Sequence, residues 1–501
     1  MTQHSRRDVL KAAGVATGIG LSGYGLSTLD DGTVRAAETE ATPYWPMARQ
    51  NAQGTSHNVE AVSPVNEFET AWAWEADQHG LQSTPVVSED TVYVVEHEFD
   101  MENGRITLRA LDEEDGSERW SVTTEGYTQS PAVAGDLVYL QTQLETQALN
   151  VEDGAVVWKR EDIGNRRVSP TIVGDTLYVN NSGTIVALDR KTGETEQKFE
   201  LGTEKSVRSD PVVANGTLYA GTYNTLYAVD IETGSTQWSV ETTNEIETIA
   251  VSNETVYYTD SRLVAVDTSG TQRWTNTDVG GEFAVGGEHI FAMGSDSTNE
   301  AALVAIDRES GEEVWSFDTL NEIHATPSVA NGAVYVTGMI DSIRRYQDHL
   351  HLFVLDAQTG IQHSHVERGD NEWFAEQALP VDGRVYFGAF TISGSEKENF
   401  LWALDGPVAE NNHAIEIDST PDLDSTDFDE GDSVALDASG SVDPNGEIVE
   451  FEWDTTGDGN YDETGPQIQM DLSFCGVQDV TVKTTDDEGD TTTKTIQVDT
   501  T

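Results

Sequence analysis

Residues 169–199 read SPTIVGDTLYVNNSGTIVALDRKTGETEQKF and contain four short segments of strand-forming residues with turns between them. Apolar and polar residues alternate along the segments, while glycine, aspartate and asparagine stand between them, as hairpin-linked antiparallel strands require. The third segment ends in Ala187-Leu188-Asp189, and Gly193 follows where a hairpin needs the positive φ that glycine adopts easily. This stretch therefore predicts one four-stranded antiparallel sheet.

The same pattern occurs eight times between Gln82 and Asp405. The second strand of each unit carries an aromatic residue, and successive ones are 34 to 51 residues apart: Tyr93, Tyr139, Tyr178, Tyr219, Tyr257, Phe291, Tyr335 and Tyr386. The third strand of each unit ends in Asp or Asn: Asp112, Asn150, Asp189, Asp230, Asp267, Asp307, Asp356 and Asp405. A period of about 40 residues with four short strands is typical of propeller blades. The sequence therefore predicts an all-β fold built on an eight-bladed β-propeller with four-stranded blades.

The ends of the repeat predict how the ring closes. The eighth unit stops at Asp405 after its third strand, whereas a spare strand, residues 70–75, precedes the first unit. We expect this N-terminal strand to complete the last blade, because closure leaves no open sheet edge. In six units the fourth strand carries a large aromatic ring that we expect to fill the wedge between neighbouring blades: Trp120, Trp158, Phe199, Trp238, Trp274 and Trp315.

The repeat units resemble the pyrroloquinoline-quinone (PQQ) type repeats of eight-bladed propellers. This group spans quinoprotein dehydrogenases and non-catalytic relatives such as the outer-membrane assembly lipoprotein. Residues 44–49, YWPMAR, are similar to the segment that often precedes the first blade of these proteins. The resemblance covers residues 44–406, and it implies the fold more strongly than the function, because one fold hosts many functions.

The resemblance also implies what a catalytic member would need. Quinoprotein dehydrogenases use two adjacent cysteines beneath the cofactor, Ca²⁺ ligands and a catalytic aspartate, whereas this chain has one cysteine, Cys475, outside the repeats. No catalytic residue of that group can be transferred to this sequence. We therefore expect a protein that is not an enzyme and that binds no PQQ; the alternative is a quinoprotein-like oxidoreductase with degenerate ligands.

The N-terminus is similar to an export signal. Residues 5–11, SRRDVLK, resemble the twin-arginine motif, with Val9 where phenylalanine is more usual, and a glycine-rich apolar stretch follows that is too short to be a convincing membrane span. We expect residues 1–36 to be a signal peptide, residues 37–67 to connect it to the propeller of residues 68–407, and the mature chain, without a transmembrane segment, to be extracellular or on the cell surface. The alternative is an ordinary amphipathic N-terminal helix.

The charge of the chain limits its partners. It has 90 acidic and 27 basic residues, a formal net charge of −63, and only 8 lysines against 19 arginines. A uniform acid excess with few lysines is typical of halophilic proteins; the alternatives are an acidic binding surface and a disordered chain. Nucleic acid and anionic membranes would be repelled. With a single cysteine, neither an intramolecular disulfide nor a thiolate metal cage can form.

The blade topology predicts a binding face at one rim of the ring. Residues three positions before the first-strand proline are expected at the mouth of the central channel, and long loops of the seventh unit share that rim. The candidate ligand-binding residues are Gln82, Arg167, Arg208, His324, Gln377, Arg344 and Arg345. Because arginine is scarce yet gathers on this rim, one hypothesis is an anionic partner such as an acidic peptide, glycan carboxylates or a phosphate. The alternative is local pairing with Asp and Glu.

The seventh unit has two histidine pairs. His349 and His351 lie on one strand, His363 and His365 on the next, and period two places each pair on one face. We expect His351 and His365 to be cross-strand neighbours with Glu367 nearby, a ligand set that suits zinc or nickel. The alternative is polar histidines at a blade edge, and the choice depends on the register.

Residues 408–501 resemble the polycystic-kidney-disease (PKD) domain, an immunoglobulin-like β-sandwich. The resemblance rests on residues 434–439 (VALDAS), 451–454 (FEWD) and 480–482 (VTV), and Trp453 is the expected core tryptophan. Oxygen side chains alternate around a glycine turn, as in a calcium loop: Asp454, Asp458, Asn460 and Asp462. The alternative is a Gly-Asp turn between two strands.

These observations favour a secreted or cell-surface, non-catalytic propeller of a halophile. We expect a monomer that binds cell-envelope proteins or surface glycans, with the PKD module as a spacer or adhesion module. We expect no cofactor, PQQ included; the ions for which the sequence offers ligands are calcium in that module and a transition metal at the histidines. Apart from the oxidoreductase, the remaining alternative is a polysaccharide-binding accessory protein.

Overall fold

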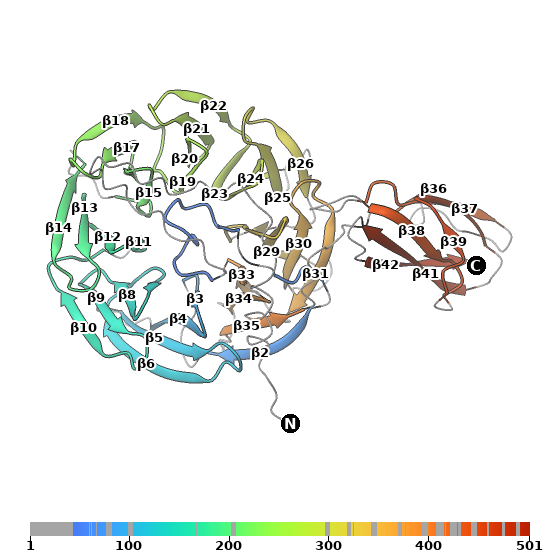
Figure 1. Ribbon diagram of the computed structural model, residues 1–501, viewed down its shortest axis with the longest axis horizontal. Coiled ribbons are helices and arrows are strands. Elements are labelled where there is room, and N and C mark those ends of the chain that lie inside the picture. The colour runs from blue at the N-terminus through green and yellow to red at the C-terminus, as the bar shows by residue number, and fades with distance from the viewer. Residues whose placement is uncertain are drawn as a thin grey trace, which may run out of the picture. The chain divides into compact units, whose positions relative to one another are not determined.

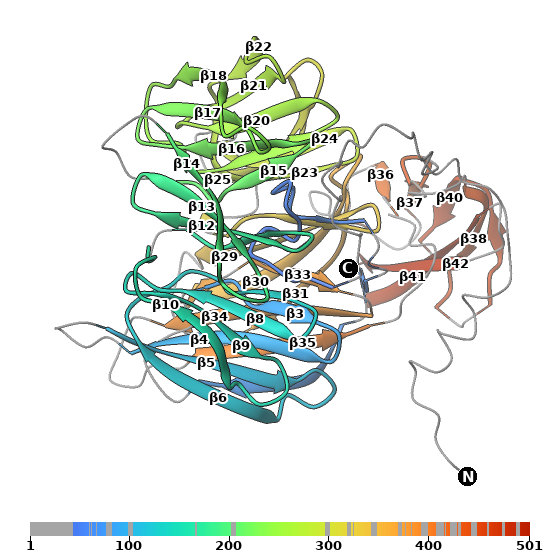
Figure 2. The same cartoon turned by 60° about the vertical axis from the view of Figure 1, so that its left-hand side comes forward.

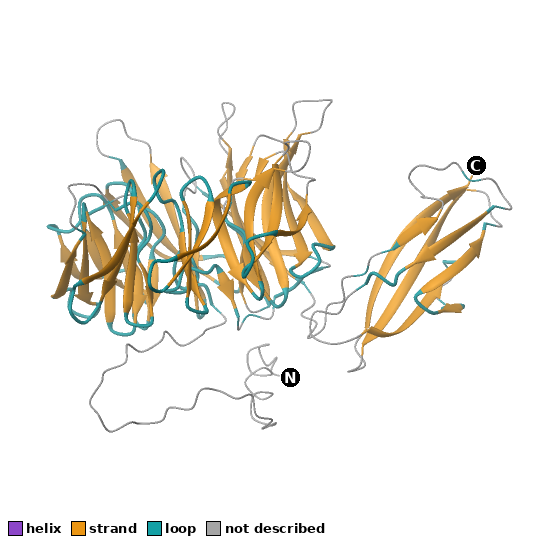
Figure 3. Ribbon diagram, turned by 90° about the horizontal axis from the view of Figure 1, so that it is seen from above, coloured by secondary structure: helices purple, strands orange, loops and turns teal. Residues whose placement is uncertain are grey.

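The computed structural model describes a chain made of strands. The described residues are 44–59, 61, 63–66, 68–76, 83–98, 104–165, 168–201, 207–295, 301–317, 322–323, 325–341, 348–368, 373–375, 377–381, 383–391, 399–406, 415, 417–420, 428, 432–441, 448–457, 460–472, 476–486 and 491–500. Every regular element among these residues is a β-strand, and none is a helix (Figure 3). The predicted all-β class is confirmed.

In the described part of the chain, strands between His57 and Asp405 form eight sheets, which we number in chain order (Figure 1). The first contains β3 (Val86–Ser88), β4 (Thr91–Glu98), β5 (Arg105–Asp112) and β6 (Glu118–Glu125). The second contains β7 (Ala132–Ala134), β8 (Leu137–Gln141), β9 (Thr146–Asn150) and β10 (Val156–Arg160). The third contains β11 (Thr171–Val173), β12 (Thr176–Asn181), β13 (Thr184–Asp189) and β14 (Thr195–Glu200). The fourth contains β15 (Val212–Ala214), β16 (Thr217–Gly221), β17 (Thr225–Asp230) and β18 (Thr236–Glu241).

In each sheet the first strand of the unit lies innermost and later strands lie further out, and in the eighth sheet β2 is the outermost strand. The fifth contains β19 (Ile249–Ser252), β20 (Thr255–Thr259), β21 (Leu263–Asp267) and β22 (Gln272–Asn276). The sixth contains β23 (Val279–Gly286), β24 (His289–Ser295), β25 (Ala301–Asp307) and β26 (Glu313–Phe317). The seventh contains β1 (His57–Asn58), β27 (Glu322–Ile323), β28 (Ser328–Ala330), β29 (Ala333–Asp341), β30 (Asp348–Asp356) and β31 (Gln362–Arg368). The eighth contains β2 (Glu69–Glu75), β32 (Trp373–Ala375), β33 (Leu379–Val381), β34 (Arg384–Thr391) and β35 (Asn399–Asp405).

The recurrent Asp at the end of the third strand builds the turn that follows it. In the third sheet, Asp189 Oδ1 accepts hydrogen bonds from the backbone N–H of Lys191 at 3.0 Å and of Thr192 at 2.8 Å. Gly193 has a φ of +71° and donates its N–H to the Asp189 carbonyl at 2.8 Å. The side chain thus stabilises the turn by a local side-chain-to-backbone bond, which explains the Asp-x-x-x-Gly spacing.

A tryptophan on the outermost strand joins each of several sheets to the next. Trp158 of β10 packs on the turn of the third sheet so closely that a Cβ added to Gly193 would lie 2.7 Å from the indole. Its Nε1 donates to the Arg190 carbonyl at 3.0 Å. The same contact joins Trp72 to Gly116, Trp120 to Gly154, Trp238 to Gly270, Trp274 to Gly311 and Trp315 to Gly360. The expected role of the aromatic rings between sheets is confirmed at these positions.

Two sheets lack this tryptophan. In the third sheet Gln197 occupies the position, opposite Ala187, and its side chain lies at Gly234. Phe199, two residues further on, is buried between the third and fourth sheets in a cluster with Val213. In the seventh sheet the position belongs to Ser364, opposite Val354, where the neighbouring space is filled from elsewhere.

The chain ends of the repeat close the ring as predicted. Strand β2 pairs antiparallel with β35, with Ala73 opposite Trp402 and Glu69 opposite Asp405. Trp72 of β2 then packs on Gly116 of the first sheet and donates Nε1 to the Glu113 carbonyl at 3.0 Å. The spare N-terminal strand therefore supplies both the outer strand of the eighth sheet and its contact with the first (Figure 1).

Residues 44–59, 61 and 63–65, which we call the connecting segment, run along the inner edge of the sheets (Figures 1 and 2). Its backbone carbonyls accept hydrogen bonds at 2.7 to 3.0 Å from valine N–H groups on the innermost strands of six sheets. The donor and acceptor pairs are Val87–Trp45, Val133–Pro46, Val213–Ala52, Val251–Gln53, Val285–Thr55 and Val329–Ser56. Each innermost strand is an edge of its sheet, with a backbone N–H group that no other strand of the sheet accepts. The carbonyls of the connecting segment accept hydrogen bonds from these N–H groups.

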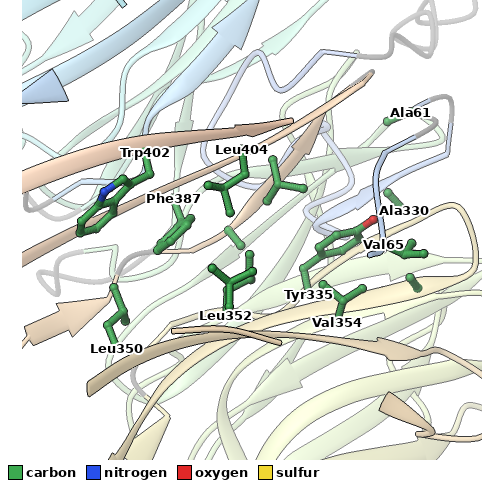
Figure 4. Packing of buried hydrophobic residues seen from close by; sticks show 14 residues of the cluster. Ala61, Val65, Ala330, Tyr335, Leu350, Leu352, Val354, Phe387, Trp402 and Leu404 are labelled. Carbon is green, nitrogen blue, oxygen red and sulfur yellow. The ribbon is translucent and has the colours of Figure 1, made fainter. Parts of the chain in front are cut away.

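The end of the connecting segment fills the gap between the seventh and eighth sheets. Ala61 and Val65 are buried in a cluster with Tyr335 and Trp402 (Figure 4). Ser364 Oγ donates to the Val65 carbonyl at 2.5 Å. These residues take the space that a tryptophan occupies at other junctions.

The C-terminal module is a separate pair of sheets. One sheet contains β36 (Asp418–Thr420), β37 (Ser433–Asp437) and β40 (Gln467–Asp471), and the other contains β39 (Glu463–Thr464), β38 (Ile448–Asp454), β41 (Gly476–Asp486) and β42 (Thr491–Thr500). Trp453 is fully buried in its core and donates Nε1 to the Gly465 carbonyl at 2.9 Å. Cys475 lies outside the described residues.

Candidate functional site

A cavity of about 370 Å³ lies inside the ring, with the connecting segment as its floor. Met47, Arg49, Asn51 and Gly54 form the floor. The walls are residues at or just before the inner strands: Ser83, Thr84, Gln129, Ser130, Ser169, Thr171, Arg208, Asp210, Glu247, Thr248, Glu282, Ala325, Thr326 and Gln377. Because every sheet presents the same end of its inner strand to the centre, equivalent repeat positions meet here.

The cavity is acidic on one side and neutral on the other. Asp210, Glu247 and Glu282 come from the fourth, fifth and sixth sheets. The other sheets contribute hydroxyl and amide side chains, such as Ser83, Gln129 and Thr326 among the described residues. The arrangement places three carboxylates side by side along one wall.

Arg49 lies in the floor beside this wall. Its Nη2 donates to the Gly54 carbonyl at 2.8 Å and to the Phe283 carbonyl at 2.5 Å, and its Cζ lies 5.6 Å from the centre of the Phe283 ring. Burial lowers the pKa of Arg49, while Glu282 and Asp210 oppose that shift. The guanidinium therefore donates hydrogen bonds to main-chain carbonyls and interacts with the carboxylates only by electrostatic attraction through space.

Among the wall carboxylates, Asp210 is half-buried, while Glu247 and Glu282 are exposed to the cavity and solvent. Burial raises the pKa of Asp210 to about 6, although the Ser169 N–H donates to its Oδ1 at 2.6 Å and Arg49 acts in the opposite direction. Burial also raises the pKa of Glu247, and the charge of Glu282 adds to that effect. Carboxylates that repel one another and lose water bind protons, or other cations, more readily.

Two of the predicted channel-mouth residues line this cavity. Arg208 Nη1 lies 3.2 Å from Glu245 Oε1, and its Cζ lies 5.0 Å from the centre of the Tyr223 ring. Gln377 Nε2 donates to Ser328 Oγ at 2.9 Å. Gln82, Arg167, His324, Arg344 and Arg345 lie outside the described residues.

Four charged residues of the cavity were not predicted as site residues. Asp210 and Glu247 precede inner strands and could have been found from the repeat, because they stand close to the position that identified Arg208. Glu282 lies within β23 after an irregularity in its pairing, so its repeat position is shifted. Arg49 ends the YWPMAR stretch that resembles an entry segment, but that resemblance does not indicate the path of the connecting segment through the ring.

The connecting segment separates this cavity from a second one of about 400 Å³. Asn51 lines both, and the second cavity is also lined by His57, Asn215, Asn253 and Arg308. Burial lowers the pKa of His57 to about 4, and the charge of Arg308 adds to that effect. The second cavity therefore presents a neutral imidazole and an arginine, in contrast to the acidic wall of the first.

The histidines of the seventh sheet have a different register from the one expected. His351 is opposite Glu367, and His365 is opposite Phe353, so the two histidines are diagonal and not direct partners. Their ring centres are 5.9 Å apart. Val354 of β30 pairs with Ser364 of β31 and Leu355 with Gln362, so an irregularity at His363 shifts the pairing. The side chain of His349 lies outside the described residues, and His363 stands at the irregularity.

The acidic loop of the C-terminal module uses its carboxylates for its own turns. Asp454 Oδ1 accepts the Gly457 N–H at 2.8 Å, and Asp462 accepts the Thr455 N–H at 3.0 Å. Asn460 is exposed, and Asp458 lies outside the described residues. Across the described residues, no group of three or more His, Cys, Asp or Glu side chains is placed to hold one metal ion. Calcium binding by this loop stays a prediction.

A family model matches most of the chain. The model described as "Outer membrane protein assembly factor BamB" matches residues 32–276 and 259–442. The chain belongs to the BamB family. A curated relative, the outer membrane protein assembly factor BamB of Vibrio cholerae, is 30% identical over 126 residues, which are 21% of this chain and 32% of that protein. The aligned part thus spans about a third of the length of that BamB protein.

Solved structures resemble the chain at low identity. BamB from Moraxella catarrhalis is 18% identical, with a TM-score of 0.42 over 54% of this chain and 97% of that chain. A europium-containing methanol dehydrogenase is 12% identical, with a TM-score of 0.57 over 73% of this chain and 98% of that chain. The second likeness shows a propeller-type fold and nothing about activity. The described residues of this BamB-family chain include no helix with the length and apolar character needed to cross a bilayer.

Proposed function

We propose that this chain is a non-catalytic interaction protein of the cell envelope or surface. Its eight sheets would act as the blades of an eight-bladed propeller, and the central cavity with its mouth would bind a protein or glycan partner. Membership of the BamB family supports the role and the location. The observation that carries the proposal is a polar cavity that the connecting segment closes at one end and that equivalent positions of the sheets surround.

An oxidoreductase is the alternative from the same fold, and the cavity does not fit its cofactor. PQQ is a tricarboxylate, whereas the wall of the cavity carries Asp210, Glu247 and Glu282. Carboxylates of the wall would repel those of the cofactor. The chain also has a single cysteine, so it has no pair of adjacent cysteines. Titration of the purified protein with PQQ should leave the spectrum of the quinone unchanged.

We also propose roles for the N-terminal residues, the acid excess and the C-terminal module. Residues 1–36 would direct twin-arginine export, and the acid excess would adapt the surface of a monomeric protein to high salt. The two-sheet C-terminal module would be a PKD-type spacer or adhesion module, which the buried Trp453 between its sheets supports. Its acidic loop would take calcium only if the ion replaced the turn hydrogen bonds of Asp454 and Asp462.

The test is site-specific crosslinking in envelope extracts. A photoreactive amino acid replaces Gln377 at the cavity, and in a matched protein it replaces Gln237, which lies exposed on the outer strand β18. We expect a discrete crosslinked protein or glycan from position 377 and none from position 237. Crosslinks of equal yield from both positions, or none from position 377, would contradict the proposal.

A further inference from the structure

Among the described residues, the wall carboxylates of the cavity are balanced only through space, by Arg49. Within the described residues none of the three wall carboxylates forms an ion pair: Arg208 reaches Glu245 instead, and Arg49 donates to the carbonyls of Gly54 and Phe283. One oxygen of Asp210 accepts the Ser169 N–H. The acidic wall therefore has unused acceptor capacity that faces an open space.

The space itself has the size and the lining of a small-molecule site. Its volume of about 370 Å³ lies within the range of roughly 300–1,000 Å³ that is usual for ligand pockets. The carboxylates come from three neighbouring sheets and spread along the wall. The opposite side offers hydroxyl and amide groups from Ser83, Gln129 and Thr326. Such a lining suits a compact ligand with a positive end and a polar or neutral body.

The strained electrostatics of the wall point in the same direction. Glu247 and Glu282 interact through space, and so do Asp210 and Glu282, which raises the proton affinity of the first member of each pair. A cation placed between them would relieve that repulsion and would form charge-assisted hydrogen bonds with the carboxylates. Arg49 does not supply this cation, because it is held in the floor.

We propose that the acidic wall formed by Asp210, Glu247 and Glu282 binds one organic cation, a protonated amine or a guanidinium group. The group would arrive as a small free amine or as the lysine or arginine side chain of a partner polypeptide. This inference rests on the proposed role of the cavity as the binding site and adds the chemistry of the ligand. It differs from the prediction of an anionic partner, which was based on the rim arginines.

The experiment measures calorimetric binding of three probes to the full chain. Agmatine carries a guanidinium and an ammonium group, the capped peptide acetyl-Gly-Arg-Gly-amide presents arginine in a polypeptide, and acetyl-Gly-Gln-Gly-amide is the neutral control. The protein variant is Glu247→Gln/Glu282→Gln. The matched control is Glu232→Gln/Glu241→Gln, which removes the same charge from exposed positions that do not line the cavity. Circular dichroism checks the fold of each protein.

We expect binding of agmatine or the arginine peptide that weakens at least about tenfold in the cavity variant and less than about twofold in the control, since hydrogen bonds to charged groups are strong. Glu247→Asp/Glu282→Asp, which keeps the charge, should recover part of the affinity. Binding of agmatine alone identifies a free amine, and binding of the arginine peptide identifies a basic side chain.

Three results would overturn the inference. They are no binding of either cation to the unmodified chain, equal weakening in the cavity variant and the control, and binding of the neutral peptide as tight as that of the arginine peptide. The crosslink from position 377 is measured separately. A crosslinked partner without cation binding therefore removes this inference alone, and loss of the crosslink removes the proposed function.

Discussion

At the scale of single residues, Asp210 shows that the cavity costs stability. Asp210 is half-buried and has no ion pair among the described residues, and the loss of surrounding water raises the pKa of its carboxyl to about 6 from an ordinary value of 3.8. The folded chain therefore holds the proton of Asp210 more tightly than the unfolded chain does. The folded state loses stability through this group as the pH rises from about 4 to about 6, and the loss is complete above that range.

Replacing Asp210 by asparagine should therefore stabilise the protein. We expect Asp210→Asn to raise the free energy of unfolding at pH 8 by on the order of 1–3 kcal/mol, with a smaller gain at pH 5. The amide of the substituted side chain would keep an oxygen for the Ser169 N–H. Denaturant unfolding at both pH values measures the effect. Asp175→Asn serves as control, because Lys191 lowers the pKa of Asp175; a gain there as large as that of Asp210→Asn would refute the explanation.

At the scale of elements, the turn of one sheet and the tryptophan of the preceding sheet act as one unit. The Ala of the third strand faces that tryptophan, as Ala148 faces Trp158, and the Asp and Gly of the next turn shape the surface on which the indole lies. The recurrent Ala-Leu-Asp and the turn glycine therefore have two functions, local conformation and packing between sheets. Gly193 illustrates both, since its φ is +71° and the indole of Trp158 leaves no room for a side chain there.

The steric part of this role can be separated from the conformational part. Gly193→Ala places a methyl group 2.7 Å from the Trp158 ring, whereas Gly216→Ala has a φ of +74° and no atom within 4 Å. We expect Gly216→Ala to cost about 1 kcal/mol, the left-handed strain alone, and Gly193→Ala to cost about 2–4 kcal/mol. Thermal and denaturant unfolding measure the difference. Equal costs would show that the turn yields to the methyl group.

The strands and the pairing of the chain ends could be predicted from the sequence, and the contents of the centre could not. Period-two alternation, Gly turns and the aromatic repeat indicate local structure, so the spare strand around Trp72 was correctly placed beside Trp402. Phe199 was expected to be the ring of the third sheet, whereas Gln197 holds the position equivalent to the tryptophans, because the pairing of the fourth strand decides which residue is opposite the alanine. Ser364 holds that position in the seventh sheet, for which no ring was predicted. Register is a tertiary property, and for the same reason His351 and His365 are diagonal neighbours and not direct partners.

At the scale of the whole molecule, the connecting segment is a structural part of the ring. It accepts hydrogen bonds from six sheets through backbone carbonyls. Because every residue has such a carbonyl, the sequence pattern does not predict the path of the segment through the ring. It also provides the floor of the acidic cavity and separates that cavity from the second one, where His57 and Arg308 lie. The charges of the two cavities differ because Asp210, Glu247 and Glu282 line the first, whereas His57 and Arg308 line the second.

Deletion of residues 44–58 should expose the inner edges of the sheets. We expect faster hydrogen–deuterium exchange at Val87, Val133, Val213, Val251, Val285 and Val329, whose N–H groups lose their acceptors, and little change at the outer strands. Mass-spectrometric exchange resolved by peptide measures this, with the Thr236–Glu241 strand as internal reference. Protection that persists at the inner valines would mean that neighbouring groups of the ring replace the segment.

The position of the connecting segment has a consequence for biosynthesis. Asn58 donates to the carbonyl of Pro380, 322 residues later, and Trp72 reaches its strand partner only when β35 has been made. Asn58 and β2 leave the ribosome early and thus find these partners almost last, and loops that long close slowly. A nascent chain that ends before residue 380 lacks the partners of Asn58 and β2. Assembly of this ring is therefore expected to finish after translation of the last repeat and not blade by blade.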